Sequence, residues 1–207
     1  MRATMIPLPS AIVGDRVVVR PFARGDGRAV FDAVDGSRAQ LATWVPWPDR
    51  HGTIEDSEHF ARTAHAKWLL REDLIVGVWD RGGALLGGSG LHRFDWATRA
   101  FEIGYWLRHE AQGQGYMREA VKLLAALAFV RLSAIRVEIA CDERNVRSAG
   151  IPRALGFAAE AHLHNHQYAT DGELRDTLIF ALTPTIYREL PWRQGAETLL
   201  ASADNDG

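Results

Sequence analysis

The chain has a single cysteine, Cys141, among its 207 residues, so no disulfide can form within it. Long apolar runs are also missing, because the most apolar stretch, residues 120–130, is interrupted by Lys122 and is shorter than the roughly 20 residues that cross a bilayer. Neither sign of charge is in excess, since 24 Lys and Arg stand against 26 Asp and Glu. These absences favour a reducing, cytoplasmic compartment and predict neither a membrane nor a nucleic acid as partner.

The first residues, MRATMIPLPSAIVGD, lack an unbroken apolar segment, which argues against a secretory signal. Hydrophobic residues make up 47% and charged residues 24% of the chain, the balance of an ordinary globular protein. The length predicts one domain, which we expect over residues 1–183. A C-terminal extension, residues 184–207, would follow, with a fraying end at residues 201–207.

Hydrophobic periodicity predicts both strands and helices in this domain. Strands are expected over residues 17–19, 74–79, 84–94, 100–107, 135–139, 157–168 and 173–182, and helices over residues 29–34, 37–43, 53–70, 116–132 and 145–155. Thr53 is the expected N-cap of the third helix, Gly156 the expected C-cap of the last, and Asp171-Gly172 the expected hairpin turn. This order predicts a single α/β domain with a mixed sheet.

A glycine-containing loop, residues 112–117 (QGQGYM), lies between a predicted strand and a predicted helix. Glycine lets the backbone turn tightly and come close to a ligand. The first N–H groups of the next helix are unpaired and lie at its positive dipole end, which suits a pyrophosphate. The alternative is a turn that needs glycine only for its geometry. A Walker A loop is excluded because no Gly-Lys-Ser/Thr follows, and the third glycine of a dinucleotide fingerprint is missing.

Four sequence blocks, in this order, resemble the GCN5-related N-acetyltransferase superfamily, in particular its branch of ribosomal-protein N-terminal acetyltransferases called RimJ/RimL. The blocks are Leu91-His92-Arg93-Phe94-Asp95-Trp96, residues 101–107 (FEIGYWL), residues 112–116, and Asn145-x-x-Ser148 leading to Leu155-Gly156-Phe157. The resemblance spans residues 74–182 and is looser before residue 70. It implies a mostly antiparallel central sheet whose middle strands splay apart, flanked by helices, with acetyl-CoA as co-substrate.

The resemblance also implies which residues bind the cofactor. The family's Gln/Arg-x-x-Gly-x-Gly/Ala motif falls on Gln112, Gly115 and Met117, and Met117 departs from the small-residue pattern. The strand before the loop pairs with pantetheine through its backbone in this family, and a side chain after the next strand contacts the pantetheine arm. The implied set is Trp106, Leu107 and Arg108 on the strand, Gln112, Gly113, Gln114, Gly115, Tyr116 and Met117 in the loop, and Asn145.

Acetyl transfer to an amine needs the amine in its neutral form and a proton for the leaving thiolate. Glu102, on the strand expected to carry the acetyl group, matches an acidic residue of relatives and is the candidate base; the alternative is a structural salt bridge. Ser148 is the candidate acid, because Pro152 stands where many relatives have tyrosine; the alternative is a hydroxyl bonded within the first helical turn. Cys141 carries no signal of a nucleophile and is expected to be buried.

Further aromatic and histidine residues have candidate roles. Trp44, Trp47 and His92 are candidate acceptor-site residues, although the two tryptophans fit a cover over the core equally well. The alternating residues His162, His164 and His166 would share one face of a strand. Three imidazoles can bind Zn²⁺, but one straight strand does not easily wrap a tetrahedral ion, so we predict no metal and a polar, substrate-facing strand. The segment GGSG at residues 87–90 predicts a bulge or close backbone packing.

We therefore expect an N-acetyltransferase in which the amine attacks acetyl-CoA directly in a ternary complex. The expected acceptor is a peptide or protein N-terminal α-amine, because about one-tenth of an amine with a pKa near 8 is neutral at pH 7, against about one lysine in several thousand. Alternatives are a small amine (polyamine, amino acid or aminoglycoside), a larger acyl donor, and a non-enzymatic acyl-CoA-binding sensor. Homodimers are common among relatives, so a homodimer stays open.

Overall fold

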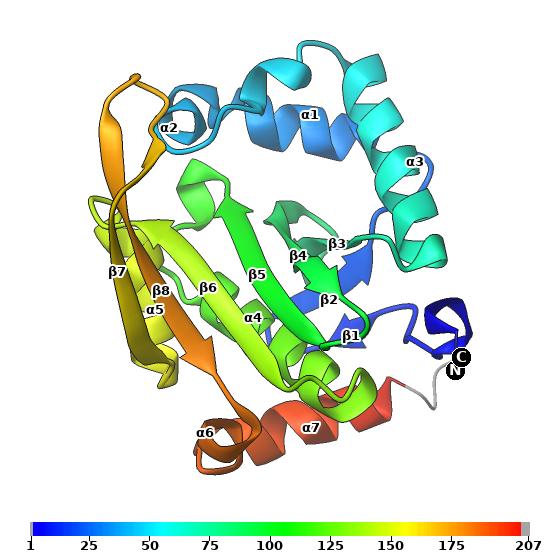
Figure 1. The fold of residues 1–207 in the computed structure, drawn as a ribbon. Helices are drawn as coiled ribbons and strands as arrows, with labels where there is room; N and C mark the ends of the chain where they lie inside the picture. The colour runs from blue at the N-terminus through cyan, green and yellow to red at the C-terminus, as the bar shows by residue number, and fades with distance from the viewer. Residues whose placement is uncertain (1, 204–207) are drawn as a thin grey trace.

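In the computed structural model, which describes residues 2–203, eight strands form one mixed sheet with helices on both faces (Figure 1). The strand order is β1-β2-β3-β4-β5-β6-β8-β7, and β5 and β6 are the parallel neighbours. The strands are β1 (Ile12–Val13), β2 (Val17–Pro21), β3 (Leu74–Asp80), β4 (Leu85–Asp95), β5 (Ala100–Leu107), β6 (Arg136–Asp142), β7 (Ala158–Tyr168) and β8 (Leu174–Leu182). The predicted single-domain α/β fold with a mostly antiparallel sheet is confirmed.

The helices divide between the two faces of the sheet. They are α1 (Gly27–Asp35), α2 (Arg38–Ala42), α3 (Ile54–Leu70), α4 (Tyr116–Ala126), α5 (Val146–Leu155), α6 (Pro184–Arg188) and α7 (Arg193–Ser202). A core that includes Leu91, Ile103 and Leu124 lies under α4, α5 and α7. A second core, around Phe22 and Trp79, lies under α1, α2 and α3. None of the helices in the described chain is both long and apolar enough to cross a membrane.

Local signals place most elements where the sequence predicts them. The Thr53 hydroxyl accepts a hydrogen bond from the N–H of Asp56, whose carboxylate accepts one from the N–H of Thr53, so the predicted cap of α3 is confirmed. Gly156 ends α5 at φ 80°, a conformation that favours a residue without Cβ. The periodicity does not predict β1, α6 or α7, because β1 has two residues, α6 has five, and α7 buries only Ala196 and Leu200 fully.

The residues after 183 pack on the main core. Ala196 and Leu200 of α7 belong to the core cluster that contains α4, and α7 packs against α4. The predicted fraying end begins at residue 201, but Ala201 and Ser202 continue α7, and residues 204–207 lie outside the described residues. The domain boundary after residue 183 stays a prediction.

The parallel strands β5 and β6 separate partway along their length. In the described chain their pairing joins Ala100 to Arg136 and Phe101 to Val137, and it ends where Glu102 meets Glu138. Beyond this point the two strands diverge toward the end of the sheet near α2 (Figure 1). Their outer edges stay paired, β5 with β4 and β6 with β8. The predicted splay is therefore present, and it leaves a gap between two unpaired strand edges.

Candidate active site

The glycine loop, residues 112–117, follows β5 and borders the gap between β5 and β6. Gly113 and Gly115 adopt φ values of 73° and 83°, a region that favours glycine. Gly115 is the N-cap of α4 and has no side chain to bond the first N–H groups of the helix. The carbonyl of Gly115 accepts the N–H of Glu119, so the intrahelical bonds begin one turn later. The first-turn N–H groups are thus available to an anion.

Two guanidinium groups flank the loop. A Cβ atom built on Gly115 would lie 3.2 Å from Nη2 of Arg16 and 3.4 Å from Nη2 of Arg118. Nη1 of Arg16 donates to the carbonyl of Gln114 at 2.9 Å, which holds this cation on the loop. Backbone donors, a helix N-terminus and two cations together fit the pyrophosphate of acetyl-CoA.

The loop residues Met117 and Gln112 take different directions. The Met117 side chain is 2% exposed and lies in the core, so its departure from the family's small-residue pattern does not crowd the loop. The amide of Gln112 donates to the carbonyl of Leu107 at 3.4 Å and accepts a bond from Nη1 of Arg147 at 2.7 Å. Arg147 belongs to α5, so this bond joins the β5 side of the gap to its far side. The sequence analysis missed Arg147, since no motif position marks it.

The strand residues of the predicted cofactor set lie along the gap. Trp106 and Leu107 pair with Gly88 and Gly87 of β4, which leaves their other backbone edge unpaired by β6 in the described chain. Arg108 follows the strand, and its Nε donates to Glu110 at 3.0 Å. A pantetheine arm paired with this free edge stays a prediction that the geometry accommodates.

A tyrosine crosses the gap to the start of α5. Asn145 caps α5, and its Oδ1 accepts the N–H of Ser148 at 3.0 Å. The hydroxyl of Tyr105, on β5, donates to the carbonyl of Ser148 at 2.9 Å, and Oγ of Ser148 donates to the Tyr105 oxygen at 3.3 Å. Burial raises the pKa of Tyr105, so its phenol stays protonated near neutral pH.

The Ser148 hydroxyl is thus bonded across the gap instead of within its own helical turn. Pro152 has no hydroxyl to offer, whereas β5 brings the hydroxyl of Tyr105 to Ser148. The sequence analysis missed the contact between Tyr105 and Ser148, because Tyr105 lies on the same face of β5 as Phe101 and Ile103 and has the pattern of a core residue. Cys141 is free and buried, as predicted, and burial raises the pKa of its thiol.

Glu102 and His92 point to the opposite side of β5. They pair with each other across β5 and β4, so their side chains share the face that α1–α3 partly cover. Oε2 of Glu102 accepts a bond from Nη1 of Arg93 at 3.0 Å. Nδ1 of His92 lies 2.6 Å from Oδ1 of Asp73, which orients the imidazole. Asp73 is a third functional candidate that the sequence analysis missed, because it lies 19 residues from His92 in the chain.

Glycines of β4 and β5 make room for the rings on this face. A Cβ atom on Gly90 would lie 2.7 Å from the His92 imidazole, and one on Gly104 would lie 3.2 Å from it. A Cβ atom on Gly88 would lie 2.5 Å from the indole nitrogen of Trp106. The predicted close packing at residues 87–90 is therefore correct, and it forms a floor for His92 and Trp106.

The tryptophan loop and the β7–β8 hairpin border the same side of the sheet. Trp47 packs edge-to-face on Trp106 with ring centroids 5.5 Å apart, and Trp44 is half-buried. The hydroxyl of Thr170, at the hairpin tip, donates to the carbonyl of Thr43 at 2.8 Å. Acceptor roles for Trp44 and Trp47 stay predictions.

The three histidines of β7 do not share one face, so that prediction is wrong. The β7–β8 register shifts between Leu163 and Gln167, and this irregularity breaks the simple alternation. Nδ1 of His166 lies 3.1 Å from the hydroxyl of Thr177, whereas His162 and His164 both contact the carboxylate of Asp176. Asp176 and Thr177 are consecutive in β8 and point to opposite faces.

Residues 16–158 match the family model of the acetyltransferase (GNAT) domain. The chain is 24% identical over 174 residues to YdaF of Bacillus subtilis (strain 168), covering 82% of this chain and 92% of that protein. It is 21% identical over 168 residues to the ribosomal-protein-serine acetyltransferase of Escherichia coli (strain K12), covering 77% and 88%. Its fold is similar to that of the microcin C7 self immunity acetyltransferase MccE, solved with acetyl-CoA and AMP, with a TM-score of 0.75 at 20% identity over 82% of this chain and 93% of that one.

The fold, the splayed gap and the glycine loop thus define an acetyl-CoA-dependent N-acetyltransferase, and the chain belongs to the GNAT acetyltransferase family. The predicted enzyme class, its co-substrate and the RimJ/RimL-like resemblance are confirmed.

We expect Gly115→Asp to abolish acetyl-CoA binding. The substitution puts a side chain at φ 83° and a negative charge where the phosphates would lie. Calorimetric titration of the folded variant with CoA measures the effect. Gly172→Asp is the matched control, since Gly172 has φ 84° with nothing within 4 Å of its Cβ position. Wild-type affinity in Gly115→Asp would remove the cofactor site from this loop.

Proposed function

We propose that the enzyme acetylates the N-terminal α-amine of a protein or peptide. The observation that carries this proposal is that Glu102 and His92 lie on a face of β5 that α1–α3 cover only in part, beside the gap. One cavity of about 290 Å³ is lined by Phe129 and Tyr187, and a second of about 200 Å³ lies beside the glycine loop, lined by Leu86, Gln114 and Tyr116; neither is lined by Glu102 or His92. An open face accommodates the end of a flexible chain. The name of the ribosomal-protein-serine acetyltransferase supports the same class of acceptor.

An α-amine acceptor requires only a weak general base in the active site. An α-amine needs little help to lose its proton near neutral pH, whereas neutralising a lysine costs about 3 kcal/mol more. Acetyl-CoA supplies the acyl group as a thioester. The residues of the chain then have three tasks: they hold the amine, accept its proton, and provide a proton to the leaving thiolate.

We assign the proton transfer from the amine to His92. Asp73 lies 2.6 Å from Nδ1 of the ring, which would leave Nε2 to accept the proton and would stabilise the cation that forms. Glu102, the base predicted from the sequence, is bonded to the largely exposed Arg93 at 3.0 Å. Its carboxylate is suited to attract a positively charged N-terminus. The oriented imidazole is the better acceptor, because imidazole is the side chain that ordinarily changes charge near neutral pH.

Two variants separate these roles. We expect His92→Gln to lower kcat and to steepen its dependence on pH, with activity recovering as the amine loses its proton unaided. Glu102→Gln should raise KM and leave the shape of the pH–rate profile of kcat unchanged. Both profiles are measured with one peptide substrate on protein of matched Tm. The reverse pattern would return the role of base to Glu102.

The thiolate should receive its proton from Ser148. A thiol with a pKa near 8.5 leaves fairly well unaided, so we expect Ser148→Ala to lower kcat by only about 10- to 100-fold. The dissociation constant of acetyl-CoA should stay nearly unchanged. Tyr105→Phe is the comparison, since it removes the oxygen that the serine hydroxyl bonds. A full loss in Tyr105→Phe with none in Ser148→Ala would make the tyrosine the donor.

A thiol-release screen with acetyl-CoA tests the function itself. The acceptors are peptides with a free N-terminus, the same peptides with a blocked N-terminus and an internal lysine, polyamines and aminoglycosides. We expect turnover with free α-amines and none with blocked peptides, and mass spectrometry locates the acetyl group. Turnover confined to polyamines or aminoglycosides would favour a small-amine enzyme. Binding of acetyl-CoA without release on any acceptor would favour a sensor module.

A further inference from the structure

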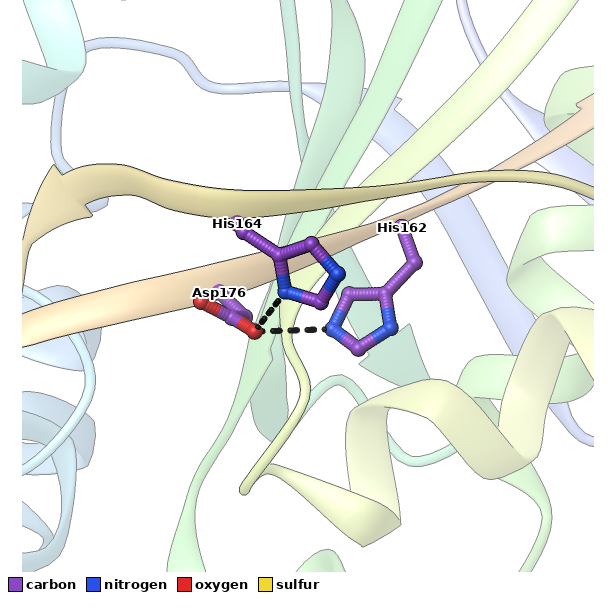
Figure 2. A group of neighbouring side chains, drawn as sticks. All are labelled: His162, His164 and Asp176. Atoms are coloured by element: carbon purple, nitrogen blue, oxygen red, sulfur yellow. Dashed lines mark hydrogen bonds and ion pairs between the residues drawn. The ribbon is translucent and has the colours of Figure 1, made fainter.

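Four metal-binding side chains from three segments converge on the surface beside α5. His162 and His164 come from β7, Asp176 from β8, and Glu143 from the turn between β6 and α5. Oδ2 of Asp176 lies 3.0 Å from Nε2 of His162 and 2.6 Å from Nδ1 of His164 (Figure 2). Oε2 of Glu143 lies 3.0 Å from the same nitrogen of His162. One donor atom each from His162, His164 and Asp176 lies within 4.8 Å of the others.

The backbone holds this arrangement in place. The register shift between Leu163 and Gln167 contains Asn165 at φ 49°, and the N–H of Asn165 donates to Oδ1 of Asp176 at 2.8 Å. The N–H of Glu143 donates to the backbone carbonyl of Asp176 at 3.2 Å, which ties the turn to β8. One oxygen of Asp176 is therefore oriented while the other faces both imidazoles.

The donor set and its spacing suit a small, borderline-soft cation. Zn²⁺ takes nitrogen and oxygen ligands at about 2.0–2.1 Å, which places tetrahedral donors about 3.3 Å apart. The three contacts at 2.6 and 3.0 Å would widen by a few tenths of an ångström to admit the ion. Glu143 contacts His162 but lies outside the group of donor atoms within 4.8 Å, so its side chain would move toward the ion. Two carboxylates would balance its charge, and two imidazoles favour zinc over calcium or magnesium.

We propose that His162, His164 and Asp176 form a zinc site, which Glu143, in contact with His162, completes as the fourth ligand. A straight strand could not supply such a site, but the irregular register of β7, together with carboxylates from β8 and the β6–α5 turn, surrounds the ion from three directions. Bound zinc would link β7, β8 and this turn. Glu143 stands two residues before Asn145, the cap of α5, so the ion would stiffen the turn that positions Ser148.

Zinc titration of the full chain, freed of any affinity tag and dialysed against chelator, tests the site. We expect one Zn²⁺ per chain by calorimetry, and a Tm that rises with zinc concentration because zinc binds the folded state. His162→Gln and His164→Gln should each weaken binding at least tenfold. His166→Gln is the matched control, since His166 lies on the same strand but bonds Thr177. It should bind zinc like the wild type.

Two further measurements keep the result interpretable. Circular dichroism and Tm without metal show that each variant is folded, so weaker binding reports the ligands. Co²⁺ in place of Zn²⁺ gives visible absorption whose intensity reports a tetrahedral site. Absence of zinc binding to the folded wild type would overturn the proposal. Wild-type zinc affinity in both His162→Gln and His164→Gln would overturn it as well. The outcome does not depend on the acceptor amine, because no acetyl transfer is measured.

Discussion

The end of the pairing between β5 and β6 is the constraint on which the candidate active site depends. Two strand edges with unpaired backbone groups are costly when buried, so a ligand, a side chain or solvent must satisfy them. β4 and β8 hold the outer edges of the two strands, which keeps the gap open at one end and closed where Glu102 meets Glu138. The bonds from Tyr105 to Ser148 and from Arg147 to Gln112 span this gap and set the distance between its walls.

Strand alternation then divides the chemistry between two sides of β5. Tyr105 points toward α5 and Ser148, whereas Glu102 points to the other face, where His92 lies beside it. With the roles we propose, a thioester held in the gap would have a proton donor on one side and proton acceptors on the other. This separation agrees with direct transfer in a ternary complex, because the attacking amine and the leaving thiolate need opposite proton movements. Glycines at positions 88, 90 and 104 leave space for the rings on this face of β5, since any Cβ there would meet the rings of Trp106 or His92.

Contacts between residues far apart in the chain account for what the sequence analysis missed. Asp73 is recognisable as a partner of His92 only when β3 pairs with β4, and Arg147 only when α5 stands beside the glycine loop. The wrong prediction that His166 shares a face with His162 and His164 has a related cause. The alternation of side chains holds for a regular strand, and nothing in the composition of β7 marks where its register shifts. For Met117 the tertiary structure removes a concern instead. Its large side chain departs from the small-residue pattern of the motif, but it lies in the core and does not crowd the glycine loop.

Short-range physics let the sequence by itself determine the fold class, the caps of α3 and α5, and the glycine loop with its helix N-terminus, whereas the family came from the resemblance of four sequence blocks. These features depend on periodicity, on capping hydrogen bonds and on the conformational freedom of glycine, all of which act within a few residues. Only the tertiary structure decided which side chains meet: Tyr105 with Ser148, Asp73 with His92, and Glu143 and Asp176 with two of the three histidines. The physical reason is that strand register and the divergence of β5 from β6 arise from packing of the whole sheet, so they determine distances that no local pattern encodes.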